Sequence, residues 1–170
     1  KLLNKEKVPL SGGILILLTI FLLLKDINIL SKLIFLLIFL LGLLSDIDKL
    51  KSSIIRIFLQ TILIAFLIFY NSTFVLSTKL FFIDFLLENY FLFKLFFTLF
   101  CFVVLINGTN FIDGTNCLVS GYFIALFLNI IILISSLNLN VSIQEIYPFL
   151  TSLIVFFVFN FFSRSFLGDG

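Results

Sequence analysis

The sequence predicts an all-α, polytopic membrane protein, and three observations support this fold class. Hydrophobic residues make up 62 % of the 170 residues and charged residues only 12 %, whereas about 25 % of an ordinary soluble domain is charged. The mean hydropathy is +1.31. The apolar residues come in long blocks, without the polar face of a surface helix and without the alternation of a transmembrane β-strand.

Six spans are expected, because a helix needs about 17–25 mostly apolar residues to cross a bilayer. Each apolar block is bounded by a short polar or charged segment. Asn129 and Asn160 are polar residues inside two of these spans, and we expect them to form hydrogen bonds between helices. No internal repeat or linker divides the chain, so the spans belong to one transmembrane domain. They cover residues 13–25, 27–44, 54–70, 90–106, 118–137 and 146–162.

The segment from residue 71 to residue 89 mixes charged residues with many Phe and Leu. This composition is typical of an interfacial amphipathic segment rather than a full crossing. Asp84 and Glu88 are four residues apart, as paired catalytic carboxylates can be. A solvated helix face is the interpretation that we favour for these two residues.

Charge and cysteine content exclude several classes of function. The formal net charge of +2 is too small to indicate a nucleic-acid partner, and the chain has no His. Cys101 and Cys117 are expected to act as small apolar residues rather than as a disulfide. The sequence begins with Lys1 and stops at Gly170 after a Gly-Asp pair, so we expect a domain truncated at both ends.

The predicted topology places the polar segments 1–13, 45–53, 107–117 and 163–170 on one side of the membrane. Seven of the 11 Lys and Arg residues belong to that side, which the positive-inside rule assigns to the cytoplasm. Asp46, Asp113 and Asp169 then share one face. Three separate aspartate loops on one face indicate a site more strongly than any one of them does alone.

Residues 107–122, NGTNFIDGTNCLVSGY, form the most polar stretch between two apolar runs. Asn107, Asn110 and Asp113 recur every third residue, so on a helical or turn-like backbone they point in roughly the same direction. Carboxylates suit Mg²⁺, which neutralises a diphosphate, and amides suit a nucleobase edge or a sugar hydroxyl. The pattern therefore indicates phosphoryl transfer, and no P-loop is present.

Four motifs resemble those of the polyprenyl-phosphate sugar-1-phosphate transferases. This family includes the phospho-N-acetylmuramoyl-pentapeptide transferase and the undecaprenyl-phosphate N-acetylglucosamine-1-phosphate transferases. The stretch NGTNFIDGTNCLVSGY is the most specific of the four, and together they extend over essentially the whole chain. The other three are KVPLSGG at residues 7–13, GLLSDIDKL at residues 42–50 and FLGDG at residues 166–170.

The resemblance implies a Mg²⁺-dependent enzyme of the cytoplasmic (inner) membrane with its active face in the cytoplasm. It would transfer a sugar-1-phosphate, with an N-acetylhexosamine as the expected sugar, from a UDP-sugar to undecaprenyl phosphate and release UMP. The product would enter peptidoglycan, lipopolysaccharide or another cell-envelope polysaccharide. The implied partners are both substrates, the lipid bilayer and a second copy in a homodimer, with no nucleic acid.

The resemblance also assigns roles to individual residues. Asp46 and Asp113 are implied as catalytic residues and Asp169 as the Mg²⁺ ligand. The implied substrate-binding residues are Lys7, Lys49, Asn107, Asn110 and Asn116.

Two positions depart from the family pattern. Ser45 stands where the first residue of an Asp-Asp pair is expected, and Asp48 would face another way on a helix. Cys117 replaces a usual Gly. These departures leave a catalytically impaired homologue that binds lipid or nucleotide as one alternative, and an unrelated membrane transporter using Asp84 and Asp113 as another. We expect the 170-residue chain alone to be inactive.

Overall fold

The computed structural model describes residues 12–24, 27–47, 49–50, 52–112, 117–137, 144 and 146–162. Within these residues the chain forms seven α-helices and no strand. The helices are α1 (Gly12–Leu22), α2 (Ile29–Asp46), α3 (Ser53–Asn71), α4 (Phe81–Asn89), α5 (Phe91–Ile112), α6 (Leu118–Ser136) and α7 (Ile146–Phe161).

Length and composition distinguish the helices that can cross a membrane. Four helices, α2, α3, α5 and α6, are long and apolar enough to span it, while α1 and α7 are shorter apolar helices. The nine residues of α4 extend about 14 Å at 1.5 Å per residue, which is too short to cross a bilayer core of about 30 Å. The prediction of an all-α polytopic membrane protein is confirmed.

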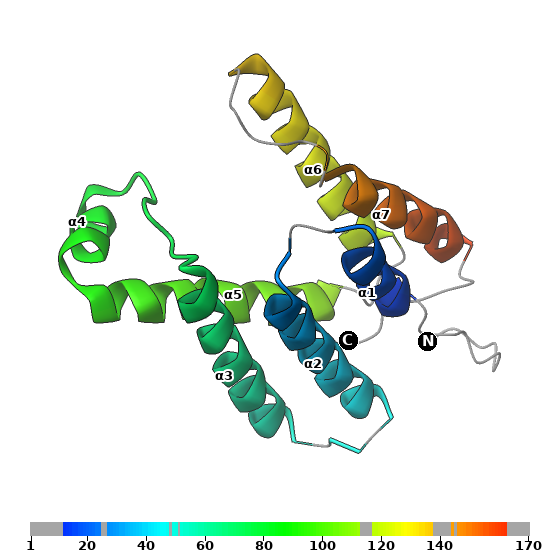
Figure 1. Ribbon diagram of the computed structural model, residues 1–170, viewed down its shortest axis with the longest axis horizontal. Coiled ribbons are helices and arrows are strands. Elements are labelled where there is room, and N and C mark those ends of the chain that lie inside the picture. The colour runs from blue at the N-terminus through cyan, green and yellow to red at the C-terminus, as the bar shows by residue number, and fades with distance from the viewer. Residues whose placement is uncertain are drawn as a thin grey trace.

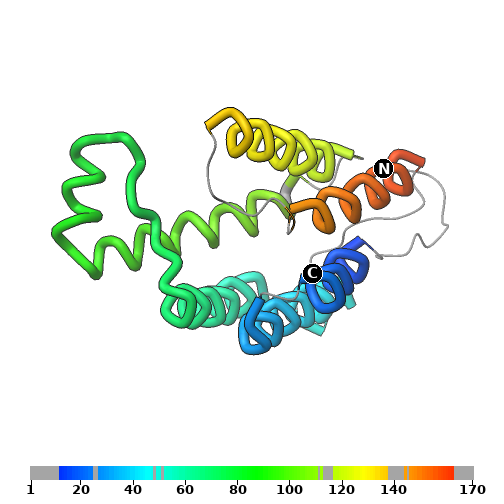
Figure 2. Tube along the Cα trace, turned by 45° about the horizontal axis from the view of Figure 1, so that its top comes forward, coloured from blue at the N-terminus to red at the C-terminus, as the bar shows by residue number. Residues whose placement is uncertain are grey.

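Contacts between helices join α1, α2, α3, α5, α6 and α7 in a closed ring of neighbours, and α4 contacts α5. Helix α3 contacts both α2 and α5, α1 contacts both α2 and α7, and α6 packs against α7. Ile64, Ile68 and Leu99 form a buried cluster between α3 and α5. Figures 1 and 2 both show α4 at the far end of α5 from the α6–α7 pair. The opposite end of α5, which carries the polar stretch, meets the start of α6.

Helix α5 extends beyond the expected span end at residue 106 and includes Asn107–Ile112. The sequence left a helical or a turn-like backbone open for this polar segment, and the structure shows that residues 107–112 are helical. The Asn107 side-chain amide donates a hydrogen bond to the Val103 carbonyl oxygen at 2.9 Å, and the Thr109 hydroxyl donates to the Ile106 carbonyl oxygen at 2.8 Å. Such bonds satisfy the polar side chains on their own helix, so these residues continue it.

Asp84 anchors the turn that precedes α4. Its carboxylate accepts hydrogen bonds from the Thr78 backbone N–H at 2.6 Å, the Ser77 hydroxyl at 2.8 Å and the Lys79 backbone N–H at 3.1 Å. The bond from the Thr78 N–H is the main cause that lowers the pKa of Asp84 below its ordinary value of 3.8. A carboxylate with these contacts has a structural role, which removes the basis for pairing it catalytically with Glu88.

The two asparagines inside the spans behave differently. The Asn160 side-chain oxygen on α7 accepts the backbone N–H of Cys117, so the expected bond between helical elements is confirmed there. The Asn129 amide instead donates to the Ala125 carbonyl oxygen of its own helix at 2.8 Å, so that prediction is wrong. Asn129 is exposed on α6, and the nearest strong acceptor for its amide is its own backbone.

Candidate active site

The first group of predicted site residues lies at the end of α2. Asp46 is the last residue of this helix and is half-buried. The backbone N–H groups of Lys49 and Leu50 both donate to the Leu44 carbonyl oxygen at 3.0 Å. The chain therefore folds back over the helix end, and this leaves the Lys49 side chain exposed to solvent.

Ser45, the position where the family pattern has an aspartate, is linked to the next helix. The Arg56 guanidinium on α3 donates a hydrogen bond from Nη1 to the Ser45 hydroxyl oxygen at 2.7 Å. Arg56 occupies the first turn of α3, behind the N-cap Ser52. This contact joins the two ends of the α2–α3 hairpin beside Asp46. Sequence reasoning had counted Arg56 only among the positive charges of this side.

The second group lies on the last turns of α5. Asn107 and Asn110 are three residues apart and both half-buried, so they share one face of the helix. The side-chain nitrogen of Asn110 is buried and has no hydrogen-bond acceptor within the part of the chain that the structure describes. A buried amide donor without a partner costs about 1–3 kcal/mol. This donor is therefore a candidate to bind an acceptor oxygen of a ligand.

The start of α6 is held in place by α7. Cys117 precedes α6 and has a left-handed backbone with φ of 65°, a conformation that glycine adopts without steric cost. This geometry explains why a glycine is usual at this position of the family pattern. Besides the Asn160 contact, the Cys117 thiol donates to the Phe157 carbonyl oxygen at 3.5 Å. These contacts fix where the polar stretch re-enters the helical part of the protein.

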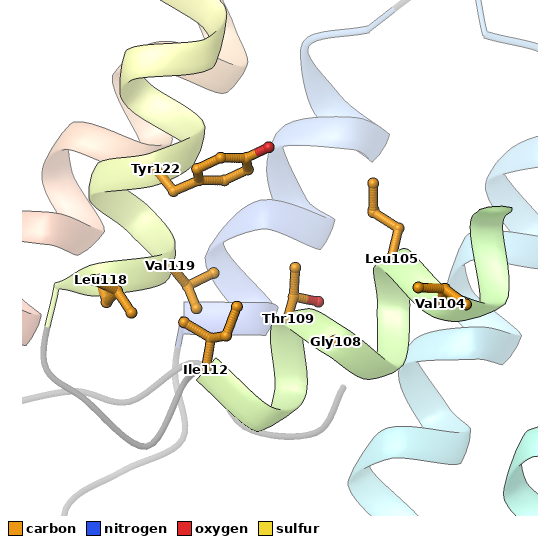
Figure 3. A pocket seen from close by; sticks show the side chains of 8 residues that line it. All are labelled: Val104, Leu105, Gly108, Thr109, Ile112, Leu118, Val119 and Tyr122. Atoms are coloured by element: carbon orange, nitrogen blue, oxygen red, sulfur yellow. The ribbon is translucent and has the colours of Figure 1, made fainter. Parts of the chain in front are cut away.

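An apolar cavity with a volume of about 380 Å³ lies between the end of α5 and the start of α6. Figure 3 shows that Tyr122 extends from α6 over this space toward α5. A Cβ atom added to Gly108 would meet no other atom within 4 Å, so the backbone of α5 borders open space there. The lining residues are Val104, Leu105, Gly108, Thr109, Ile112, Leu118, Val119 and Tyr122.

The structure thus brings the predicted residues together in two pairs. Asp46 and Lys49 lie at the end of α2, and Asn107 and Asn110 lie on α5, with α3 in contact with both of these helices. The remaining predicted residues fall outside the part of the chain that the structure describes. These are Lys7, Asp113, Asn116 and Asp169.

The donor chemistry at this site is compatible with a magnesium ion. Asp46 supplies a half-buried carboxylate, and carboxylate oxygens are the ligands that Mg²⁺ prefers. Among the described residues, no group of three or more His, Cys, Asp or Glu side chains lies close enough together to hold a metal. Asp169, the residue that the resemblance implies as the Mg²⁺ ligand, belongs to the undescribed part of the chain.

Comparison with protein families identifies one family that the chain matches. The family model for glycosyl transferase family 4 matches residues 28–170, a range that contains the ends of both α2 and α5. Neither a curated protein nor a solved structure matches the chain. Because the family match covers well over half of the sequence, the chain belongs to glycosyl transferase family 4 and is a transferase of the membrane-embedded kind.

Proposed function

We propose that this protein transfers a sugar-1-phosphate from a UDP-sugar to undecaprenyl phosphate on the cytoplasmic face of the membrane. The observation that carries the proposal is the family 4 match over residues 28–170, which includes the asparagine pair at the end of α5. An N-acetylhexosamine is the sugar that we propose. The product would serve the synthesis of peptidoglycan, lipopolysaccharide or another envelope polysaccharide.

The reaction balances as a single phosphoryl exchange. A phosphate oxygen of the lipid attacks the phosphorus bonded to the sugar, and the bond between that phosphorus and the UMP oxygen breaks. The lipid then carries a diphosphate-linked sugar, and UMP leaves. Catalysis of such a step consists mainly of aligning the reactants and stabilising negative charge.

The residues divide these tasks between them. Asp46 and Asp169 would hold Mg²⁺. The bound ion would neutralise the negative charge of the diphosphate. The exposed ammonium group of Lys49 binds phosphate oxygens. The buried Asn110 amide nitrogen donates to an acceptor oxygen of the nucleotide or sugar. Asp113 acts as the base that accepts the proton of the attacking phosphate.

The apolar cavity between α5 and α6 suits the tail of the lipid acceptor, because it begins at the helix end that carries Asn107 and Asn110. Gly108 allows a direct test of this assignment, since its Cβ position opens into empty space. Gly108→Leu should raise the KM for the polyprenyl acceptor and leave the KM for the UDP-sugar unchanged. Gly108→Ala is the matched control, and equal acceptor KM values for the two variants would contradict the assignment.

The proposed activity is tested with the protein purified in detergent, undecaprenyl phosphate, Mg²⁺ and a panel of radiolabelled UDP-sugars. We expect a lipid-extractable labelled product and an equal amount of UMP. Asp169→Asn should abolish both while leaving the helical circular dichroism spectrum unchanged. Absence of a lipid-linked product with every UDP-sugar in the panel would refute the proposed activity.

A catalytically impaired homologue is the second candidate, and the contact between Ser45 and Arg56 favours it. A serine hydroxyl replaces a carboxylate next to Asp46 and accepts a hydrogen bond from the guanidinium. If the chemistry is impaired for this reason, Ser45→Asp should raise turnover by at least tenfold. A parent protein that is already fully active would exclude this candidate. Family membership excludes the alternative of an unrelated transporter.

A further inference from the structure

A second apolar groove, with a volume of about 320 Å³, lies between α2 and α3. It is separate from the α5–α6 cavity and shares no lining residue with it. Its size falls at the lower end of the range of about 300–1,000 Å³ that is usual for small-molecule sites. The lining residues are Leu37, Leu40, Leu41, Leu44, Leu59, Ile62 and Leu63.

The groove opens outward, toward the surroundings of the membrane-spanning helices. Leu37 and Leu40 are 46 % and 42 % exposed, and Ile62 is 50 % exposed. Both helices are candidate membrane spans, so the surface that they present here faces lipid. From Leu37 to Leu44 the groove follows α2 for about 10 Å at 1.5 Å per residue, which suits a segment of a single acyl chain.

The helix register places a cation at one end of this groove. Arg56 precedes Leu59 by three residues and Leu63 by seven, so it continues the same stripe of α3 toward the helix start. On α2, Ser45 follows Leu41 by four residues and continues the groove-lining stripe there. The hydrogen bond of 2.7 Å between Arg56 and Ser45 therefore lies where the apolar lining ends.

The charge at that end defines the chemistry of the occupant. Arg56 carries a planar guanidinium, whose geometry matches phosphate oxygens. Cations next to a membrane span attract anionic lipid headgroups. An apolar groove that ends at a guanidinium is complementary to a lipid with an apolar chain and a negative headgroup.

We propose that the α2–α3 groove binds an anionic phospholipid of the bilayer, with one acyl chain along the leucine-lined groove and its phosphodiester at Arg56. This inference does not depend on the proposed transfer reaction. The groove is distinct from the α5–α6 cavity that we assign to the acceptor tail, and it ends at Arg56 rather than at Asn107 and Asn110. We assign the groove to a bilayer lipid on this ground, and competition with undecaprenyl phosphate tests that assignment against the substrate.

The absence of tryptophan from the chain makes a site-specific fluorescence test possible. Leu40→Trp places the only tryptophan in the groove, and Phe100→Trp places it on α5, at a position that is 65 % exposed and does not line the groove. Each variant is reconstituted into vesicles of dioleoylphosphatidylcholine and dioleoylphosphatidylglycerol, with one or the other lipid brominated on its acyl chains. Quenching of the tryptophan then reports which lipid occupies the nearby site.

We expect the tryptophan at position 40 to show a preference of about fivefold or more for the brominated phosphatidylglycerol, and the tryptophan at position 100 to show none. Adding Arg56→Gln should reduce the preference at position 40 by about fivefold. Arg56→Lys should retain most of it because the charge remains. Lys79→Gln, which removes a cation from the segment before α4, should leave it unchanged.

Four results would overturn the proposal. The first is equal quenching by the two lipids at position 40, and the second is a preference that Arg56→Gln does not reduce although circular dichroism shows a folded protein. The third is displacement of the brominated lipid by undecaprenyl phosphate but not by unlabelled phosphatidylglycerol, which would reassign the groove to the acceptor. The fourth is weak quenching by both lipids, relative to position 100, which would show that a second protein copy covers the groove.

Discussion

The contact between Asn160 and Cys117 allows the packing of α6 on α7 to be tested quantitatively. Asn160 is only 3 % exposed, and its side-chain oxygen accepts the backbone N–H of Cys117. Asn160→Ala removes that acceptor and leaves the N–H without this partner. Losing the partner of a buried donor costs about 1–3 kcal/mol, whereas interhelical hydrogen bonds in membranes average about 0.6 kcal/mol and reach about 1.7 kcal/mol. We therefore expect Asn160→Ala to destabilise the protein by about 1–2 kcal/mol.

The loss of the Asn160 contact can be measured through the reactivity of the Cys117 thiol. In a Cys101→Ser background Cys117 is the only thiol, and burial raises its pKa above the ordinary value of 9.0. The folded protein should then react slowly with a water-soluble maleimide at neutral pH, and faster as the pH rises and the thiolate forms. A change of 1–2 kcal/mol raises the population of an open α6 start by a factor of about 5–30. Asn160→Ala should speed the alkylation by up to that factor.

Asn129→Ala is the matched control, because Asn129 is an exposed asparagine of α6 whose amide donates to a carbonyl oxygen of its own helix. It should change neither the alkylation rate nor the midpoint of unfolding in sodium dodecyl sulfate followed by circular dichroism. Equal alkylation rates in Asn160→Ala and in the parent, together with equal unfolding midpoints, would refute the structural role assigned to Asn160.

Three further predictions concern other contacts. The pKa of Asp84 is lowered from 3.8, so its stabilisation of the Ser77–Lys79 turn is present above that pH and is lost as the pH falls through the lowered value. Asp84→Ala should speed amide exchange in the turn at neutral pH and leave transferase turnover unchanged; lost turnover would restore a catalytic role. Thr98 is fully buried, and its hydroxyl accepts the Val75 backbone N–H at 3.1 Å. Thr98→Val should therefore destabilise the protein by about 1–3 kcal/mol in the same detergent titration, and an unchanged midpoint would contradict this. Asp113→Asn should abolish turnover while the protein remains folded, and an unchanged rate would exclude its proposed role.

The sequence was sufficient for the class of fold because that class depends on composition along the chain. Long apolar blocks must lie in lipid, and a segment such as Phe81–Asn89 is too short to cross it. The motif residues could also be identified from the sequence, because Asn107, Asn110 and Asp113 follow one another at fixed spacing. The residue at which α5 ends could not be predicted in this way. Asn107 and Thr109 can bond either to water or to their own helix, and the structure shows the second.

Contacts between helices depended on the tertiary structure. Helices such as α6 and α7, which are apolar around most of their circumference, have no broad polar face to show which way they are rotated. The sequence therefore treated Asn129 and Asn160 alike, although only Asn160 faces another helical element. The link from Arg56 to Ser45 likewise arises because α2 and α3 pack side by side with these residues at the same level. Hydropathy and spacing determined which segments are long and apolar enough to cross the membrane and which residues are candidates for the chemistry. Helix rotation and packing decided which side chains meet.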